Sequence, residues 1–376
     1  MLAGDHSGVL PLTEIAVQAV VAGDFWRVQK KSLLTLPDHL GNWVLELLLE
    51  QGRLAPPQLE LFRNCATTVC IASGYAHGSG GDWLAALGKF RSLQELHLHH
   101  WAKLRPDRLA PLAPLAPCLQ QLHLPRCSGL TEQALDHIGR LTAVTDLDIS
   151  GTGISGSSGA LALLTSLTSL NLSDTRLNGS DCHWLAKLVN LRSLGVAATS
   201  IGDPSLQDLT HLALTSLDLT WTRVTQAPSM PSLQCLTMAS CDLESPQPCL
   251  TRLVLTNVEV ADVHWLADAS RLQHLDLSGT KISDSSSECL QQLHALEWLS
   301  LSHTAVTESL RQLDLSHSHF IGSLMPAPGW SGFPQLQVLK LALELTGPRL
   351  TVQIVESLRS LTLLQFLTLQ KCWLSQ

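Results

Sequence analysis

The chain has 376 residues, 45% of them hydrophobic, and a formal net charge of −8 at pH 7. An apolar fraction of this size is ordinary for a folded protein, which excludes wholesale disorder. Long basic runs are missing from the sequence, so it lacks the charge pattern of a nucleic-acid binder and favours a basic partner only weakly. Length alone would allow two or three ordinary domains.

Residues 1–31 are predicted to form a flexible tail and a short helix. Thr13 is a suitable N-cap, the stretch Ile15–Ala22 is apolar, and Gly23 ends the helix. This stretch is short and has no basic run before it, unlike a secretory signal. No run approaches the roughly 18 apolar residues that span a bilayer. We therefore expect a cytoplasmic or nuclear protein that contacts no membrane.

Residues 32–81 are predicted to form a helical capping segment and a loop. Pro37 suits the first turn of a helix and Gly52 its end, and a second short helix is expected over Pro57–Arg63. A strand over Cys65–Ser73 is expected to begin a sheet. The glycine-rich stretch that follows is a loop; it has neither the lysine nor the spacing of a phosphate-binding motif.

From residue 82 to the end, one leucine pattern recurs. Its clearest copy places Leu167, Leu170, Leu172, Thr175 and Leu177 at positions one, four, six, nine and eleven. In a strand, the leucines at positions four and six share one face, and the residues at positions three, five and seven share the other. One copy cannot bury its leucines alone, so the copies are expected to stack.

Thirteen copies follow one another at intervals of 14 to 28 residues, most of them within the range of leucine-rich repeats. They begin at Leu93, Leu119, Val144, Leu167, Leu191, Leu214, Leu233, Leu250, Leu272, Leu296, Leu310, Leu336 and Leu364. The sequence therefore predicts an α/β fold: a leucine-rich repeat solenoid with a curved parallel sheet, a helical or irregular convex side and an N-terminal helical cap.

Two features of the repeats carry further predictions. Position nine holds mostly threonine or serine, whose hydroxyls are expected to bond to backbone in the turns. The interval of 14 residues after Leu296 is too short for a strand and a full return. Residues 302–335 are therefore predicted to interrupt the sheet, either as a true insertion or as a gene-model defect.

The ten cysteines point to a reducing compartment. The sequence contains no CxxC pair and no clustered cysteine cap at the ends of the repeats. Cys127, Cys241 and Cys372 occupy position nine, where a small buried group is expected. Buried, reduced thiols are the simplest reading of this pattern.

Several runs carry a more specific resemblance. Leu217–Pro228, Ser232–Cys241 and Ser32–Leu40 resemble blocks of an intracellular leucine-rich repeat family of plants and green algae. The resemblance spans roughly residues 30–310 and implies the fold and the compartment.

A looser resemblance concerns the N-terminal segment. Leu36-Pro37 and Leu47-Leu48, placed before the repeats, are similar in layout to the start of an F-box in cullin-RING ubiquitin ligase receptors. This resemblance implies a cullin adaptor bound at residues 32–64. No match to the Cys-Arg-Arg-Trp-like end of that family is present, so a plain capping role is the alternative.

The concave face, formed by positions three, five and seven, is the expected working surface. It shows no nucleophile, base and orienting group that converge, so we expect a binding scaffold without a cofactor rather than an enzyme. Aromatic anchors and carboxylates suggest where a protein partner sits, between the repeats that begin at Leu191 and Leu296. The candidate residues are Asp218, Trp221, Asp276 and Trp298.

A histidine cluster offers the alternative function. His97 and His99 alternate on one predicted strand, and His123 is the neighbour of His97 on the next. Three imidazoles of this kind can bind zinc or copper, which would suit a metal-binding protein or a metal-dependent enzyme. The competing reading is a solvated polar patch, and no acidic residue that would orient the rings is identified.

Overall fold

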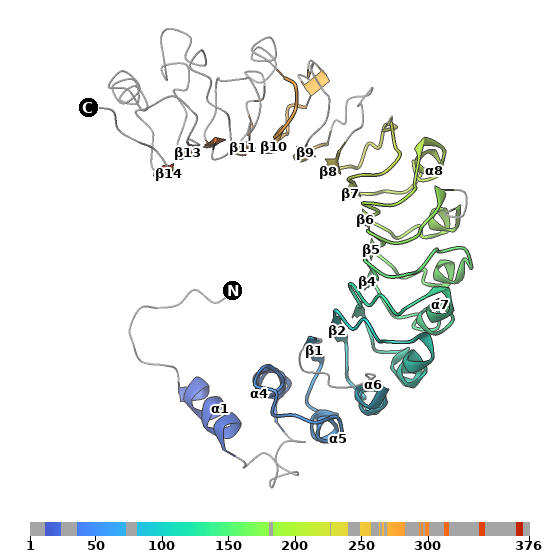
Figure 1. Ribbon diagram of the computed structural model, residues 1–376, viewed down its shortest axis with the longest axis vertical. Helices are drawn as coiled ribbons and strands as arrows, with labels where there is room; N and C mark the ends of the chain where they lie inside the picture. Colours follow the sequence, from blue (N-terminus) through green and yellow to red (C-terminus); the bar gives the residue numbers. More distant parts are fainter. Residues whose placement is uncertain are drawn as a thin grey trace. The chain divides into compact units, whose positions relative to one another are not determined.

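The fold is described from a computed structural model (Figure 1). The structure describes residues 12–23, 36–72, 81–179, 183–225, 227–239, 249–256, 263, 265–266, 269–282, 293, 295, 298–300, 312–315, 338–342 and 366–370. The chain divides into two compact units, Met1–Asn190 and Leu191–Gln376, so the predicted repeat region 82–376 is shared between them.

The first unit begins with four described helices, and the first three overlap segments for which the sequence predicts a helix. They are α1 (Leu12–Ala22), α4 (Asp38–Glu50), α5 (Pro56–Leu59) with a 3-10 turn at Glu60–Phe62, and α6 (Gly81–Leu87). Pro37 directly precedes α4, where its fixed φ suits the first turn. Gly52 has a φ of 63° just beyond α4, a conformation that glycine adopts without strain.

Five parallel strands follow in chain order in this unit. They are β1 (Thr68–Ala72), β2 (Glu95–His99), β3 (Gln121–His123), β4 (Asp146–Asp148) and β5 (Ser169–Asn171). Each strand pairs with the next at the same repeat position, as Leu96 with Leu122 shows. The expected first strand over Cys65–Ser73 is therefore confirmed for Thr68–Ala72.

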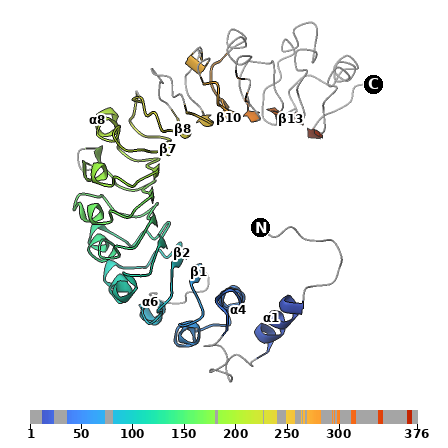
Figure 2. The same ribbon diagram turned by 180° about the vertical axis from the view of Figure 1, so that it is seen from behind.

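Return segments join the strands of the first unit. They are 3-10 turns at Pro106–Leu115, Glu132–Ala134, Ala160–Leu163 and His183–Lys187, and α7 (Leu135–Ile138). Both views of the ribbon show them on one side of the strands (Figures 1 and 2). The leucines at positions one, four and six are buried between the strands and these segments. We call the other side of the sheet, with positions three, five and seven, the open face.

The second unit repeats this arrangement with one described helix, α8 (Asp203–Gln207). Its strands are β6 (Ser193–Gly195), β7 (Ser216–Leu219), β8 (Cys235–Met238), β9 (Arg252–Leu255), β10 (His274–Asp276), β11 (Trp298–Ser300), β12 (Gln312–Leu315), β13 (Val338–Ala342) and β14 (Phe366–Gln370). They pair in parallel and in chain order. The predicted solenoid of α/β leucine-rich repeats is thus confirmed.

The expected interruption at residues 302–335 does not extend to β12. Leu313 of this strand pairs with Leu299 of β11 and with Leu339 of β13, so the ladder continues through it. The register also agrees with Leu310 as position one of its repeat. The other residues of 302–335 lie outside the described part of the chain.

Helix α4 covers the first edge of the sheet. The Asn42 side chain accepts hydrogen bonds from the backbone N–H groups of Thr67 and Thr68 at 2.8 and 3.3 Å, and donates to the Thr67 hydroxyl at 2.9 Å. Val44, Leu45, Leu48 and Leu49 of the helix are buried. The amide of Asn42 therefore satisfies backbone groups at the start of β1, and α4 acts as a cap.

Two rows of hydroxyl groups support the repeats. At position nine, each buried threonine donates to the carbonyl of its own position six, as Thr175 does to Leu172 at 2.6 Å. Thr152, Thr199, Thr222 and Thr280 make the same bond. The predicted hydroxyl-to-backbone bonding is confirmed. Each hydroxyl acts within one turn and does not bridge neighbouring repeats.

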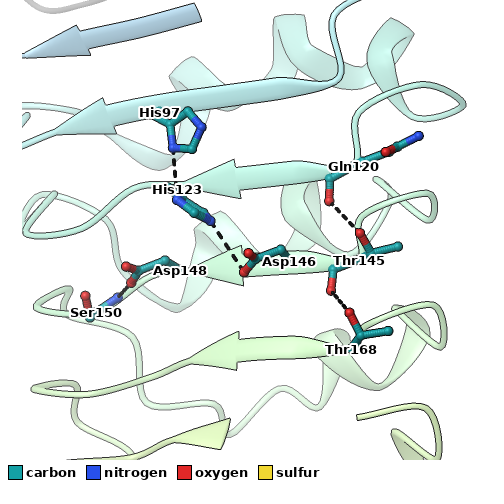
Figure 3. A network of polar contacts seen from close by, with 8 residues as sticks. All are labelled: His97, Gln120, His123, Thr145, Asp146, Asp148, Ser150 and Thr168. Carbon is teal, nitrogen blue, oxygen red and sulfur yellow. Dashed lines mark hydrogen bonds and ion pairs between the residues drawn. The ribbon is translucent and has the colours of Figure 1, made fainter. Parts of the chain in front are cut away.

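The second row, at position two, does bridge repeats. Thr145 donates to the carbonyl of Gln120 at 3.2 Å, and Thr168 donates to the carbonyl of Thr145 at 3.0 Å (Figure 3). These side chains extend the backbone ladder at the amino ends of the strands.

Among the described residues, no helix is both long and apolar enough to cross a membrane.

Candidate partner-binding surfaces

Wherever position eight of a repeat is described, it follows the strand and has a left-handed backbone conformation. In the first unit this holds for His100, Arg126, Gly151 and Asp174, with φ between 56° and 66°. In the second unit it holds for Ala198, Trp221 and Gly279, with φ between 53° and 70°. Glycine adopts this conformation freely, whereas another residue there costs about 1 kcal/mol.

Trp221 is the unusual member of this row. Its side chain is 70% exposed, the largest exposure among the described large hydrophobic side chains. The others are Ile15 in α1, Leu163 in a return segment and Val189 just after one. Trp221 is therefore the exposed apolar side chain beside the carboxyl ends of the strands, and it combines backbone strain with an exposed aromatic ring.

Asp218 and Asp276, predicted to be available to a partner, also have a structural role. Asp218 Oδ1 accepts hydrogen bonds from the Thr220 backbone N–H at 3.0 Å and from its hydroxyl at 2.6 Å. Asp276 Oδ1 accepts the same pair from Ser278. Both carboxylates therefore hold the turn that leads to position eight, which corrects the expectation that their side chains are left entirely to a ligand.

The same turn occurs in the first unit, where Asp148 accepts from the Ser150 N–H and Asn171 from the Ser173 N–H, at 2.9 and 3.1 Å (Figure 3). An aspartate or asparagine at position five followed two residues later by serine or threonine is the sequence signal for it. From the sequence, position five was expected only to line the open face, and its effect on the turn was not predicted.

Trp298 is placed through its backbone. It begins β11 at position three and pairs with His274 of β10, which puts it on the open face of the second unit. Its side chain lies outside the described part of the chain. The structure thus places the side chains of Trp221, Asp218 and Asp276 and the backbone of Trp298, and their binding of a partner stays a prediction.

The histidines of the first unit form a hydrogen-bonded cluster. Nδ1 of His97 lies 2.9 Å from Nδ1 of His123, and the rings meet edge to face with centroids 4.4 Å apart (Figure 3). Nε2 of His123 lies 3.4 Å from Oδ1 of Asp146. The His99 ring stacks beside His97 at 6.2 Å. Asp146, at position three of the next repeat, is the acidic partner that the sequence interpretation missed.

This geometry corrects the metal interpretation of His97, His99 and His123. Within the described residues, no group of three His, Cys, Asp or Glu side chains is placed to hold a metal ion. The nearest nitrogens of His97 and His123 face each other at 2.9 Å. Two nitrogens bound to one tetrahedral zinc lie about 3.3 Å apart. The parallel stacking of His99 on His97 also keeps its nitrogens from converging on the same point.

Burial shifts the pKa values of His97, of His99 and of two buried thiols. Burial lowers the pKa of His97 and of His99, and the neighbouring His123 lowers both further. Burial raises the pKa of Cys65 and of Cys127 to about 11. These two cysteines are neutral thiols at physiological pH, as expected for side chains that fill the core.

Comparisons with known proteins agree with the repeat pattern. Residues 248–306 match a family model described as Leucine rich repeat, and residues 166–188 match a second model of the same description. This is a leucine-rich repeat protein. The search of curated proteins gave no match.

Solved structures share the fold of this leucine-rich repeat protein at low sequence identity. An internalin from Listeria monocytogenes is 18% identical with a TM-score of 0.53, over 84% of this chain and 88% of the internalin. The chain in the TLR13–ssRNA13 complex is 18% identical with a TM-score of 0.52, over 86% of this chain and 53% of that one. The structure of the mouse RP105/MD-1 complex gives 19% identity with a TM-score of 0.50, over 84% of this chain and 65% of that one. At these identities the likeness concerns the fold alone.

Proposed function

We propose that the protein is a binding scaffold that holds a protein partner on the open face of the second unit, with Trp221 as an anchor. The observation that carries this proposal is the state of Trp221: a 70% exposed aromatic side chain in a left-handed conformation. Gly279 occupies the same repeat position and adopts the conformation without strain. Strained, exposed aromatic residues are more common where function requires them, because folding alone does not favour them.

The chemistry around Trp221 indicates the kind of partner. Tryptophan is enriched among the residues that dominate interface energies. Residues 191–376 contain 16 Asp and Glu against 10 Lys and Arg, and Asp218 and Asp276 place carboxylates on the open face of this unit. We infer a partner with an apolar group flanked by basic side chains. The charges would contribute specificity and association rate more than affinity.

The test compares two glycine substitutions in the row of position eight. Trp221→Gly relieves the backbone strain and removes the aromatic ring, whereas Ala198→Gly relieves the same strain one repeat earlier. Partners captured by the wild-type chain are identified by mass spectrometry, and their affinity for each variant is measured. We expect Trp221→Gly to lose about 2 kcal/mol of binding, roughly 30-fold, and Ala198→Gly to bind normally. Wild-type affinity in Trp221→Gly would contradict the proposal.

A finer proposal makes the chain the substrate-recognition subunit of a cullin-RING ubiquitin ligase, with an adaptor at residues 32–64. Val44, Leu45, Leu48 and Leu49 of α4 are buried, Leu40, Trp43 and Leu47 are half-buried, and Asn42 is bonded to the start of β1. These contacts support a capping role for this segment, which we favour over adaptor binding. Co-purification of a cullin adaptor with the full chain, lost on substituting the exposed Glu46 and Glu50 of α4, would reverse this preference.

We also propose a cytoplasmic or nuclear location. The described cysteines are free thiols, and Cys65 and Cys127 are buried. This chemistry suits a reducing compartment, as does the resemblance to an intracellular family of plants and green algae. A fluorescent fusion observed in cells tests the location, and secretion into the medium would contradict it.

A further inference from the structure

The His97–His123–Asp146 chain crosses three neighbouring strands on the open face of the first unit. His97 of β2 and His123 of β3 are direct register partners, and Asp146 lies on β4 (Figure 3). The contacts run from His97 Nδ1 to His123 Nδ1 at 2.9 Å, and from His123 Nε2 to Asp146 Oδ1 at 3.4 Å. Figure 3 shows the second nitrogen of His97 on the side of its ring away from His123.

The number of hydrogens on the ring nitrogens of the His97–His123–Asp146 chain follows from its geometry. Two imidazole nitrogens 2.9 Å apart need one hydrogen between them, since two lone pairs or two N–H groups would repel. The buried His123 Nε2 makes no hydrogen bond of ordinary geometry within the described residues, and its near neighbour is the Asp146 carboxylate. This nitrogen therefore carries a hydrogen. In the neutral chain His123 Nδ1 accepts, His97 Nδ1 donates, and His97 Nε2 is left as an acceptor.

One added proton changes His97 Nε2 whichever ring holds the charge. If His97 is the imidazolium, both of its nitrogens carry hydrogens. If His123 is the imidazolium, it donates from Nδ1 to His97, and the single hydrogen of His97 moves to Nε2. We propose that His97 Nε2 is a recognition atom switched by one proton: an acceptor when the chain is neutral, and a donor to a carboxylate of an acidic partner segment when the chain is protonated.

Several charged or titratable groups surround His97 and its neighbours. The charged and titratable neighbours are Glu95 and His99 on β2, Asp146 and Asp148 on β4, and His100 just after β2. Cys70 of β1 lies opposite His97 in the strand register and is a neutral thiol, because burial raises its pKa. Glu95 is bonded to the Thr68 hydroxyl at 3.0 Å.

A second proton is opposed by the geometry. It would place hydrogens on both Nδ1 atoms, and the 2.9 Å contact could not persist. Burial and the charge of His123 already lower the pKa of His97, in agreement with this limit. The His97–His123 pair therefore takes up one proton, and burial of His97 places the pKa of that ring below the ordinary value for histidine.

The first test is the tautomer of His97 in the full-length protein. Nitrogen-15 NMR of histidine-labelled protein distinguishes Nδ1–H from Nε2–H. At about pH 8 we expect His97 to be the Nδ1–H tautomer and His123 the Nε2–H tautomer, with His137 of α7 as a reference ring outside the cluster. An Nε2–H tautomer of His97 at this pH would overturn the proposal.

The second test uses acetate as the carboxylate probe against chloride at the same ionic strength. In the wild-type protein, acetate should shift the His97 ring signals at about pH 5.5 and not at about pH 8. His123→Ala removes the acceptor that fixes the His97 tautomer, so the response should lose most of its pH dependence. An acetate response that is missing at both pH values, or equal at both in the wild type, would overturn the switch. Unchanged ultraviolet circular dichroism confirms that the variant is folded.

Discussion

The hydroxyl of threonine at position nine forms a hydrogen bond within its own turn. Thr175 is buried and donates to the Leu172 carbonyl at 2.6 Å, whereas Thr168 at position two donates to the neighbouring repeat from a less buried site. A buried carbonyl that loses its donor keeps the full penalty of desolvation, and a solvated one does not. The position of the hydroxyl, more than its presence, therefore decides its contribution to stability.

Removing the buried hydroxyl should destabilise the first unit. Thr175→Val preserves the shape of the side chain and leaves the Leu172 carbonyl without this donor. We expect the free energy of unfolding to fall by about 1–2 kcal/mol. Thr168→Val is the matched control and should change it by less than half as much. Urea denaturation followed by circular dichroism measures both, and equal losses would contradict the distinction between the two rows.

The sequence could predict the backbone role of position nine because the threonines recur in register with the leucines. It could not predict that Trp221 is strained, because the left-handed conformation of position eight is shared by residues as different as His100, Asp174 and Ala198. The turn bonds of Asp218 and Asp276 were missed for a related reason. A short carboxylate at a strand end suits both a ligand and a turn, and only the geometry separates them.

At the scale of elements, successive repeats are joined by side chains of the return segments. The carboxylate of Glu132 accepts hydrogen bonds from the backbone N–H groups of Ser155, Gly156 and Ser158 at 2.9, 2.9 and 2.7 Å, and from the Ser155 hydroxyl at 2.9 Å. In the second unit, Asp203 accepts from the Thr225 N–H and hydroxyl. An acidic residue at the start of a return segment thus fixes the turn of the following repeat.

Glu132→Gln should weaken the first unit in a pH-dependent way. Partial burial raises the pKa of Glu132, but the hydrogen bonds from Ser158 and Ser155 outweigh it and lower the pKa overall. The stabilisation is therefore present above the unfolded pKa of about 4.3 and is lost as the pH falls through the lower folded value. We expect a loss of about 1–2 kcal/mol at neutral pH that shrinks in acid.

Thermal unfolding between neutral and acidic pH measures this effect. Asp136→Asn, at an exposed position of α7, is the control and should change stability little at any pH. A Glu132→Gln loss that stays constant as the pH falls would show that the carboxylate charge does not contribute.

The packing of α4 on the chain before β1 depends on Gly41. A Cβ atom added there would lie 2.2 Å from the carbonyl oxygen of Cys65, so the helix would have to shift. Gly41→Ala should therefore reduce stability by about 2 kcal/mol or more, despite the better helix propensity of alanine. His39→Ala, at an exposed position of the same helix, should be nearly neutral. Thermal unfolding of the two variants distinguishes overpacking from helix propensity.

At the scale of the whole molecule, the leucine spacing predicted the repeat architecture, because each unit buries its leucines only against a neighbour. It did not predict the division of the chain at residue 190, which depends on how the contacts are distributed. It predicted an interruption over residues 302–335, within which the structure describes the paired strand Gln312–Leu315. A short interval of 14 residues is no bar to strand pairing at Gln312–Leu315.

Removal of residues 1–50 should change the assembly state of the protein. The deletion takes away α4 and exposes the backbone groups of β1 that no neighbouring strand pairs, together with buried leucines of the first unit. Exposed sheet edges pair with other chains. We expect concentration-dependent self-association, measured by light scattering on size-exclusion chromatography. Adding Thr68→Lys to the truncated chain should reduce it. A truncated chain that stays monomeric at high concentration would contradict the capping role.

The side chains at position eight can differ from repeat to repeat without changing the buried leucine core. Each member follows a strand in a fixed backbone conformation, and in the first unit the row carries the exposed side chains of His100, Arg126 and Asp174, which differ in charge and size. The strand and the turn determine where each side chain is presented, and its identity is left unconstrained by the core. Within each unit, exchanging single residues at position eight should therefore change binding specificity while every buried leucine stays in place.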